Sequence, residues 1–192
     1  MLAARLRPII EPLTSGAGRT LARAHVSPNA LTTVGLAGTI ACAWLIAAGH
    51  TFLAGILLIA PMIIDVLDGA TARASGTVST WGAFYDSVSD RVGDGALFAG
   101  IAWAARVAHP RVLAAALLAL VLTFCVPYAR AKAEACGLST VAGPGERAER
   151  AVIMIAGLIL GYVEASLWVI AALTFWTFVT RCYSVWRQTT AA

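Results

Sequence analysis

Long apolar runs separated by short polar segments dominate the pattern of this chain. Six such runs occur, at residues 30–48, 52–69, 82–104, 111–134, 149–163 and 166–186. A helix needs about 20 predominantly apolar residues to cross the hydrocarbon core of a bilayer. The pattern therefore predicts an all-α integral membrane protein whose six transmembrane helices form one bundle over residues 30–186. The fifth run is short and the third contains charges, so hydropathy alone rates these two weakly.

The first 25 residues follow a different pattern. Four arginines alternate with apolar residues, and the segment lacks the unbroken apolar core of a signal peptide. This pattern predicts an interfacial amphipathic helix over residues 1–25, in front of the bundle but within one domain spanning residues 1–192. The following Ser27-Pro28-Asn29 is typical of a helix start, with Ser27 or Asn29 as the cap and Pro28 in the first turn.

Composition agrees with a membrane location, and charge predicts an orientation. The chain is 59% hydrophobic and only 12% charged, which is outside the range of an ordinary soluble domain. With six spans and a cytoplasmic N-terminus, the outer loops carry only Arg106 and Arg111. The positive-inside rule then predicts a multi-pass plasma-membrane protein with both termini cytoplasmic. The net charge of +4 is explained by the membrane topology and by attraction to anionic lipid head groups. No pattern of basic and aromatic residues indicates nucleic-acid binding.

The aspartates are concentrated in one stretch of this apolar chain. All five lie between residues 65 and 94, at Asp65, Asp68, Asp86, Asp90 and Asp94. A carboxylate near the membrane midplane costs about 2.5–3.5 kcal/mol, so the group needs compensation. The last three are spaced four apart and share one helix face, while the first two share a face near the predicted end of the preceding helix, before Gly69. Arg73 and Arg91 are too few to neutralise five aspartates.

Divalent cations are the compensation that the residue types favour. Carboxylate oxygens are hard ligands that suit Mg²⁺, Mn²⁺ or Ca²⁺. The four cysteines are scattered without a C-x-x-C pair, which argues against a thiolate metal site. Four carboxylates of this stretch could therefore hold two divalent ions, Mg²⁺ or, as an alternative, Mn²⁺.

The acidic stretch also contains a recognisable motif. It reads Asp65-x-x-Asp68-Gly69-x-x-Ala72-Arg73, then eight residues, then Gly82-x-x-x-Asp86-x-x-x-Asp90. All eight fixed positions resemble the signature of the CDP-alcohol phosphotransferases, membrane enzymes of phospholipid synthesis. The resemblance implies a six-helix enzyme, usually a homodimer, that binds a CDP-activated lipid through two divalent metals near the cytoplasmic surface.

The same resemblance implies roles for individual residues. Asp65, Asp68 and Asp86 would be metal ligands, and Asp90 would be either a ligand or the general base for the acceptor hydroxyl. The CDP-lipid would contact Asp68, Arg73 at its diphosphate, and small residues that admit the nucleotide, Gly69, Ala72 and Gly82. Asn29 and Thr32 resemble the family's P-N-x-x-T segment and would also contact the nucleotide. Asp94 is outside the signature, and a pairing with Arg91 is one interpretation.

Basic residues near the fourth and fifth runs bear on the acceptor. Arg130 and Lys132 end the fourth run, and Arg147 and Arg150 precede or open the fifth, where together they could bind a phosphate on the acceptor. The positive-inside rule alone also explains each of these basic residues, without any role in binding. The segments "RAKAEACGL" and "GERAER" resemble the phosphatidylinositol phosphate synthases of actinobacteria, whose acceptor is inositol 1-phosphate. That resemblance implies an acceptor pocket of Arg130, where the subfamily tends to have lysine, with Arg150 and Arg181.

These observations predict phosphatidyl transfer from CDP-diacylglycerol to inositol 1-phosphate, with release of CMP. The alternative acceptor is glycerol 3-phosphate, as in phosphatidylglycerol phosphate synthases. An ion-coupled transporter is a hypothesis of a different class, since intramembrane carboxylates also mark ion pathways. It would explain the aspartates but neither Arg73 nor the eight-residue gap in the motif.

Overall fold

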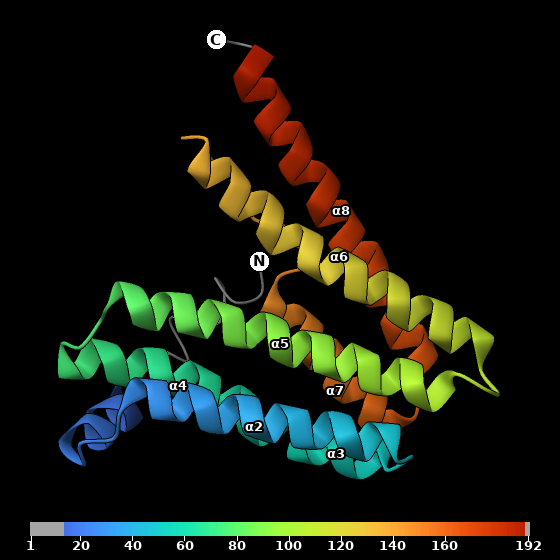
Figure 1. The fold of residues 1–192 in the computed structure, drawn as a ribbon, viewed down its shortest axis with the longest axis horizontal. Coiled ribbons are helices and arrows are strands. Elements are labelled where there is room, and N and C mark those ends of the chain that lie inside the picture. Colours follow the sequence, from blue (N-terminus) through green and yellow to red (C-terminus); the bar gives the residue numbers. More distant parts are fainter. Residues whose placement is uncertain (1–13, 191–192) are drawn as a thin grey trace.

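The structure of the protein is a computed structural model that describes residues 14–190. Over these residues it contains helices and no strand (Figure 1). Residues 14–23 are helical, and seven longer or shorter helices follow: α2 (Pro28–Ala47), α3 (Thr51–Leu57), α4 (Ile59–Ser75), α5 (Thr80–Ala105), α6 (Pro110–Ala135), α7 (Arg147–Leu160) and α8 (Val163–Thr190). The first half of the predicted interfacial helix, residues 1–13, lies outside the described residues.

The six predicted runs correspond to these helices, with one run divided. The second run is α3 and α4, which separate at Leu58. Pro61 explains the break, because a proline has no N–H to donate to the carbonyl of Leu57. Counting α3 and α4 as one segment, Thr51–Ser75, four segments of the described chain are long and apolar enough to cross a membrane; the others are α2, α6 and α8. The 26-residue α5 carries Asp86, Asp90 and Asp94, and α7 has only 14 residues.

The end of α4 corrects the sequence prediction at Gly69. The helix continues through Gly69 to Ser75 and ends at Gly76, whose φ of 68° is a left-handed conformation that suits glycine. The chain then turns, and Ser79 caps α5 by accepting a hydrogen bond from the backbone N–H of Gly82, at 3.0 Å. Asp65, Asp68 and Arg73 are therefore all on one continuous helix.

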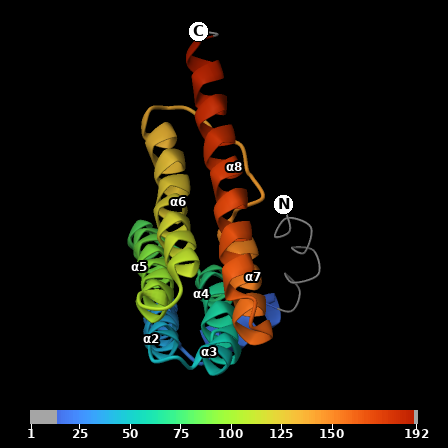
Figure 2. The same cartoon turned by 90° about the vertical axis from the view of Figure 1, so that its right-hand side faces the viewer.

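The helices pack through small residues. α2 lies against both α4 and α5, α5 contacts α6, and α6 contacts α8, while α7 packs on α3 and α8. Where α2 and α5 cross, a Cβ added at Gly100 would come within 2.5 Å of the Ala43 carbonyl oxygen, so only glycine permits this approach. The alanines of α6 that face the core are fully buried: Ala115, Ala116 and Ala119. Figures 1 and 2 show α6 and α8 side by side, extending beyond the other helices.

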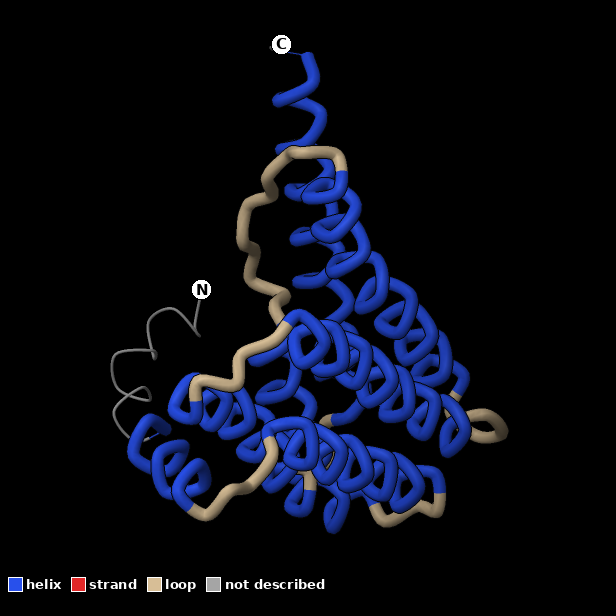
Figure 3. Tube along the Cα trace, turned by 60° about the vertical axis from the view of Figure 1, so that its left-hand side comes forward, coloured by secondary structure: helices blue, strands red, loops and turns tan. Residues whose placement is uncertain are grey.

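Two segments outside the bundle core position the site. The helical residues 14–23 pack on α4, where a Cβ at Gly18 would come within 2.8 Å of the Ala70 carbonyl. The loop at residues 136–146 leads from α6 to α7 (Figure 3). It is fastened to α8, because the N–H of Gly145 donates to the Thr177 hydroxyl at 3.0 Å. This attachment fixes the start of α7, and with it Arg147.

Candidate metal centre and the two cavities beside it

Three carboxylates from α4 and α5 form the centre of the candidate site. Asp65, Asp68 and Asp86 each offer an oxygen atom, and these atoms lie within 4.8 Å of one another. The i, i+3 spacing on α4 puts Asp65 and Asp68 on one face, and α2 holds α4 and α5 beside it. Three negative groups this close repel one another unless a cation intervenes. The prediction that the two helices bring their aspartates together is correct for these three.

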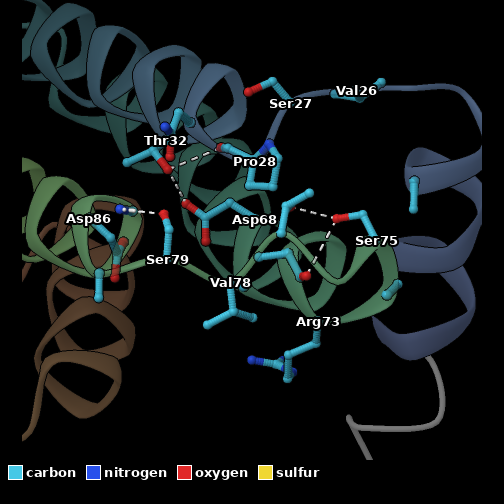
Figure 4. Close-up of a pocket in the computed structure, with 18 of the residues that line it drawn as sticks. Val26, Ser27, Pro28, Thr32, Asp68, Arg73, Ser75, Val78, Ser79 and Asp86 are labelled. Carbon is cyan, nitrogen blue, oxygen red and sulfur yellow. Dashed lines mark hydrogen bonds between the residues drawn. The ribbon is translucent and has the colours of Figure 1, made fainter.

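Asp68 is held by a neighbour from α2. The hydroxyl of Thr32 donates a hydrogen bond to Asp68 Oδ2 at 2.6 Å, and both residues are buried. Figure 4 shows this contact between α2 and α4, with Asp86 on the adjacent α5. The α2 helix starts at Pro28 as predicted, although its cap residue Ser27 makes no side-chain capping bond. The bond from Thr32 fixes the orientation of one carboxylate in the cluster.

Asp90 reaches the cluster through an arginine. Arg147, the first residue of α7, places Nη1 at 2.6 Å from Asp65 Oδ2 and at 3.0 Å from Asp90 Oδ1. Arg91 also approaches Asp90, at 3.6 Å, while donating to the backbone carbonyl of Ser87. Asp90 is thus not one of the three clustered carboxylates, and Arg147 links it to Asp65.

Asp94 lies one turn further along α5 and also pairs with α7. Arg150 Nη2 donates to Asp94 Oδ2 at 2.6 Å, and Arg150 Nη1 donates to the Gly145 carbonyl at 2.8 Å. Arg147 Nε is 3.9 Å from the other Asp94 oxygen. The interpretation of Asp94 as a partner of Arg91 is therefore wrong. Arg147 and Arg150, not Arg73 and Arg91, supply most of the positive charge beside the aspartates.

A large cavity opens on one side of the cluster. This cavity, named here the N-terminal cavity, has a volume of about 990 Å³ and lies between residues 19–29, α4 and the start of α5. Every residue predicted to contact the CDP-lipid lines it: Asn29, Thr32, Asp68, Gly69, Ala72, Arg73 and Gly82. Asp86 lines it too, along with Arg19, Arg23 and His25, which belong to the segment predicted to lie at the membrane interface. Arg73 is exposed and has no ion pair or side-chain hydrogen bond with any described residue.

A second cavity opens on the other side. This α7 cavity has a volume of about 640 Å³. Its polar lining includes Asp65, Asp90, Asp94, Arg147 and Arg150, together with Arg73, which borders both cavities. The remaining wall is largely apolar, with side chains from α4, α5 and α7 such as Met62, Leu97, Phe98 and Ile155. The carboxylates therefore separate two spaces, with Asp68 and Asp86 on one side and Asp65 and Asp90 on the other.

The three arginines predicted to bind the acceptor lie in different environments. Arg130 is on the outer surface of α6, with 61% of its side chain exposed, and pairs with Glu134 at 2.8 Å. Arg181 is buried in α8, where it donates to the Val126 carbonyl and to Glu146. Of the three, only Arg150 lines the α7 cavity, and it is already bonded to Asp94. Arg147, which is not among the three arginines predicted to form the acceptor pocket, lines this cavity and directly contacts Asp65 of the cluster.

The donor set fits a hard divalent cation. The clustered atoms are all carboxylate oxygens, which Mg²⁺ and Mn²⁺ prefer, and no arginine within residues 14–190 forms an ion pair with Asp68. Thr32 supplies the kind of outer hydrogen bond that commonly orients a ligating carboxylate. A cation here would stand between the two cavities, where it could contact ligands from both.

Sequence comparisons place the chain among lipid-synthesising enzymes. The model of the CDP-alcohol phosphatidyltransferase family matches residues 25–179. Archaetidylinositol phosphate synthase of Pyrococcus horikoshii is 34% identical over 188 residues, covering 97% of this chain and 98% of the relative. Phosphatidylinositol phosphate synthase of Streptomyces avermitilis is 37% identical over 188 residues, covering 90% and 77%.

Solved structures show the same fold. Mycobacterium tuberculosis phosphatidylinositol phosphate synthase, crystallised with CDP-DAG bound, superimposes with a TM-score of 0.82 at 30% identity, covering 91% of this chain and 94% of that one. The same enzyme in complex with manganese and citrate also gives a TM-score of 0.82, at 31% identity over 90% and 88% of the two chains.

Proposed function

The chain belongs to the CDP-alcohol phosphatidyltransferase family, and we propose that it transfers the phosphatidyl group of CDP-diacylglycerol to inositol 1-phosphate, releasing CMP. One observation carries the proposal: a cluster of three carboxylates separates a cavity lined by the whole predicted nucleotide set from a cavity lined by arginines. The names of both relatives contain inositol phosphate, which supports this acceptor over glycerol 3-phosphate. A structural neighbour holds CDP-DAG, which supports the donor.

The N-terminal cavity takes the CDP group in this proposal. Asn29 and Thr32 contact the nucleotide from α2, and Arg73, whose guanidinium has no ion pair among the described residues, binds the diphosphate. Gly69, Ala72 and Gly82 keep the wall free of bulk. At Gly82 a Cβ would stand 3.5 Å from Asn29 Oδ1, so even alanine would narrow the nucleotide space.

Two Mg²⁺ ions, or Mn²⁺, complete the site in this proposal. Asp65, Asp68 and Asp86 provide the clustered oxygens, and Asp90 contributes beside Asp65. When bound, the cations would lower the charge on the diphosphate and stabilise the attacking and leaving oxygens of the substitution. A manganese complex of the neighbouring structure supports this metal class.

The transfer itself needs a group that accepts the proton of the attacking hydroxyl and groups that bind the phosphate of the acceptor. Asp90 lines the α7 cavity and takes the proton of the inositol hydroxyl. The hydroxyl oxygen then forms a bond to the phosphorus that carries the diacylglycerol. The bond from this phosphorus to the bridging oxygen breaks, and CMP leaves with the electron pair. The arginines at the α7 cavity and behind it, Arg147, Arg150 and Arg181, provide the positive field that favours an acceptor with its own phosphate.

The membrane arrangement is part of the same proposal. α5 and α7 join the four apolar segments as membrane helices, and the single bundle sits in the plasma membrane with both termini and the site cytoplasmic. The N-terminal helix lies at the interface and carries Arg19 and Arg23. A homodimer is consistent with α4, which exposes Ile63 and Val66.

An acceptor panel with purified protein tests this function. CMP release from CDP-diacylglycerol would be measured with Mg²⁺ and, in turn, inositol 1-phosphate, glycerol 3-phosphate, inositol and serine. We expect release with inositol 1-phosphate to exceed the others by at least about tenfold, and EDTA to abolish it. Preference for glycerol 3-phosphate would establish the phosphatidylglycerol phosphate alternative. If no acceptor in the panel gave CMP release, the transferase proposal would be refuted and the ion-coupled transporter favoured.

A further inference from the structure

Arg147 occupies an unusual position for an active-site arginine. One of its nitrogens, Nη1, contacts Asp65 at 2.6 Å and Asp90 at 3.0 Å, and its Nε faces Asp94 at 3.9 Å. The side chain is 36% exposed and lines both the α7 cavity and the narrow space beside Asp65 and Asp90. Arg147 therefore forms ion pairs with the carboxylates although its side chain is still partly exposed.

The charge of Arg147 performs the task of a cation. Asp65 belongs to the group of three clustered carboxylates, and Arg147 is the positive group in contact with it. A divalent cation that binds Asp65 and Asp90 needs the same oxygens and is repelled by a guanidinium beside them. Arg147 and the cation thus compete for these two side chains.

Arg150 and Arg181 are held more firmly than Arg147. Arg150 is 7% exposed and bonded to both Asp94 and the Gly145 carbonyl, and Arg181 is 3% exposed and bonded to Glu146 and the Val126 carbonyl. Their partners are not the clustered carboxylates. Arg147 is the arginine at the α7 cavity whose two close partners a cation would take. Once released, its planar fork would face the same cavity as Arg150.

We propose that Arg147 couples the two ligands of the site: it holds Asp65 and Asp90 while the cation is absent, and turns to the acceptor phosphate when the cation displaces it. This inference rests on the metal site of the proposed function. It implies an order of binding, in which the cation binds before the phosphorylated acceptor because it releases Arg147. By linkage, removing the charge of Arg147 must tighten cation binding and weaken acceptor binding. A residue with a purely structural role would not change the two affinities in opposite directions.

The test measures Mn²⁺ and inositol 1-phosphate binding to Arg147→Gln by calorimetry, with no CDP-lipid present. We expect Mn²⁺ to bind about tenfold more tightly than to the wild type, and inositol 1-phosphate in the presence of Mn²⁺ to bind about tenfold more weakly. Arg106→Gln is the matched control, because it removes the same charge from an arginine that instead stacks on Trp103, 4.0 Å from the ring centre. Equal or weaker Mn²⁺ binding by Arg147→Gln would overturn the inference.

A measurement on the wild type covers the case in which the variant fails to fold. Phenylglyoxal modifies accessible arginines, and mass spectrometry reports the extent at each one. We expect Mn²⁺ to increase the modification of Arg147 several-fold and to leave Arg106 unchanged, whereas no increase at Arg147 would refute the exchange. A wild type that binds no Mn²⁺ would overturn this inference and the proposed metal site together. If Mn²⁺ and the variant behave as expected but the acceptor panel fails, only the acceptor assignment is lost.

Discussion

The two cavities beside the carboxylates differ in how their positive charges are used. Arg73, which lines the N-terminal cavity and also borders the α7 cavity, is exposed and has no ion pair with a described residue. In the α7 cavity Arg147 and Arg150 contact carboxylates at 2.6 Å. An unpaired arginine is ready for an anion, whereas a paired one must first lose its partner. The positions of basic residues alone therefore do not identify an anion site, since their existing partners decide how it works.

Removing one carboxylate from each cavity has the largest expected effect. Asp68→Asn and Asp90→Asn should each lower CMP release from CDP-diacylglycerol by about 10²–10³, because both take negative charge away from the reacting centre. Glu134→Gln is the control, since Glu134 is exposed and pairs only with Arg130 among the described residues. If Asp90→Asn kept near-normal turnover while Asp68→Asn lost it, the two cavities would not serve one reaction.

The support of Asp68 by α2 should be the next largest contribution. Thr32→Val keeps the branched shape but removes the hydroxyl that donates to Asp68 at 2.6 Å. Loss of such an outer contact typically weakens metal binding by about 10–100-fold. Mn²⁺ titration of the variant measures this, with Thr180→Val as control, because the Thr180 hydroxyl bonds only to carbonyls of its own helix. Unchanged Mn²⁺ affinity would mean that α2 merely packs beside the site.

The contrast between paired and unpaired arginines can be measured directly. Arg73→Gln should raise the KM for CDP-diacylglycerol about tenfold, with the free energy of unfolding unchanged within about 0.5 kcal/mol. Arg150→Ala should raise the KM for inositol 1-phosphate far more than that for the lipid, and should also lower stability by about 3 kcal/mol, because it leaves Asp94 without its closest partner. Equal effects of Arg150→Ala on both KM values, or a stable Arg150→Ala protein, would contradict the distinction.

The smallest expected effect concerns the wall of the N-terminal cavity. In Gly82→Ala the new Cβ would lie 3.1 Å from the Ser79 hydroxyl and 3.5 Å from Asn29, so we expect a KM for CDP-diacylglycerol about threefold higher. Gly16→Ala is the matched control, because no atom lies within 4 Å of a Cβ at that helical position. The comparison requires only steady-state kinetics. A normal KM for Gly82→Ala would show that the nucleotide does not approach this wall.

The sequence predicted best what depends on local spacing. The apolar runs mark the helices, and the three-residue and four-residue spacings put Asp65, Asp68 and Asp86 on facing sides of α4 and α5. The sequence misplaces the end of α4, because a glycine directly after Asp68 is typical of a helix end, whereas the helix continues through Gly69 to Ser75. The signal that marks the true end is Gly76, followed by Thr77 and the Ser79 cap of α5.

The partners of the aspartates could not be predicted from spacing. Arg150 is 56 residues from Asp94, and no local pattern relates them. Their contact depends on the loop at residues 136–146, which α8 holds through Thr177. The predicted pairing of Asp94 with Arg91 rested on their closeness in the sequence. In the structure, Arg147 and Arg150 of α7 contact the carboxylate oxygens of Asp94 instead.

In the proposed membrane arrangement, the contact between Gly18 and Ala70 would transmit events at the membrane surface to the helix that carries Asp65 and Asp68. Ala70 lies two residues beyond Asp68, so whatever displaces the leading helix also removes a lateral support from the backbone that carries this carboxylate. A larger side chain at position 18 would push the two helices apart. It would lower turnover even though it contacts neither substrate. In that arrangement, the anchoring of the first segment at the membrane and the alignment of the acidic centre would depend on each other.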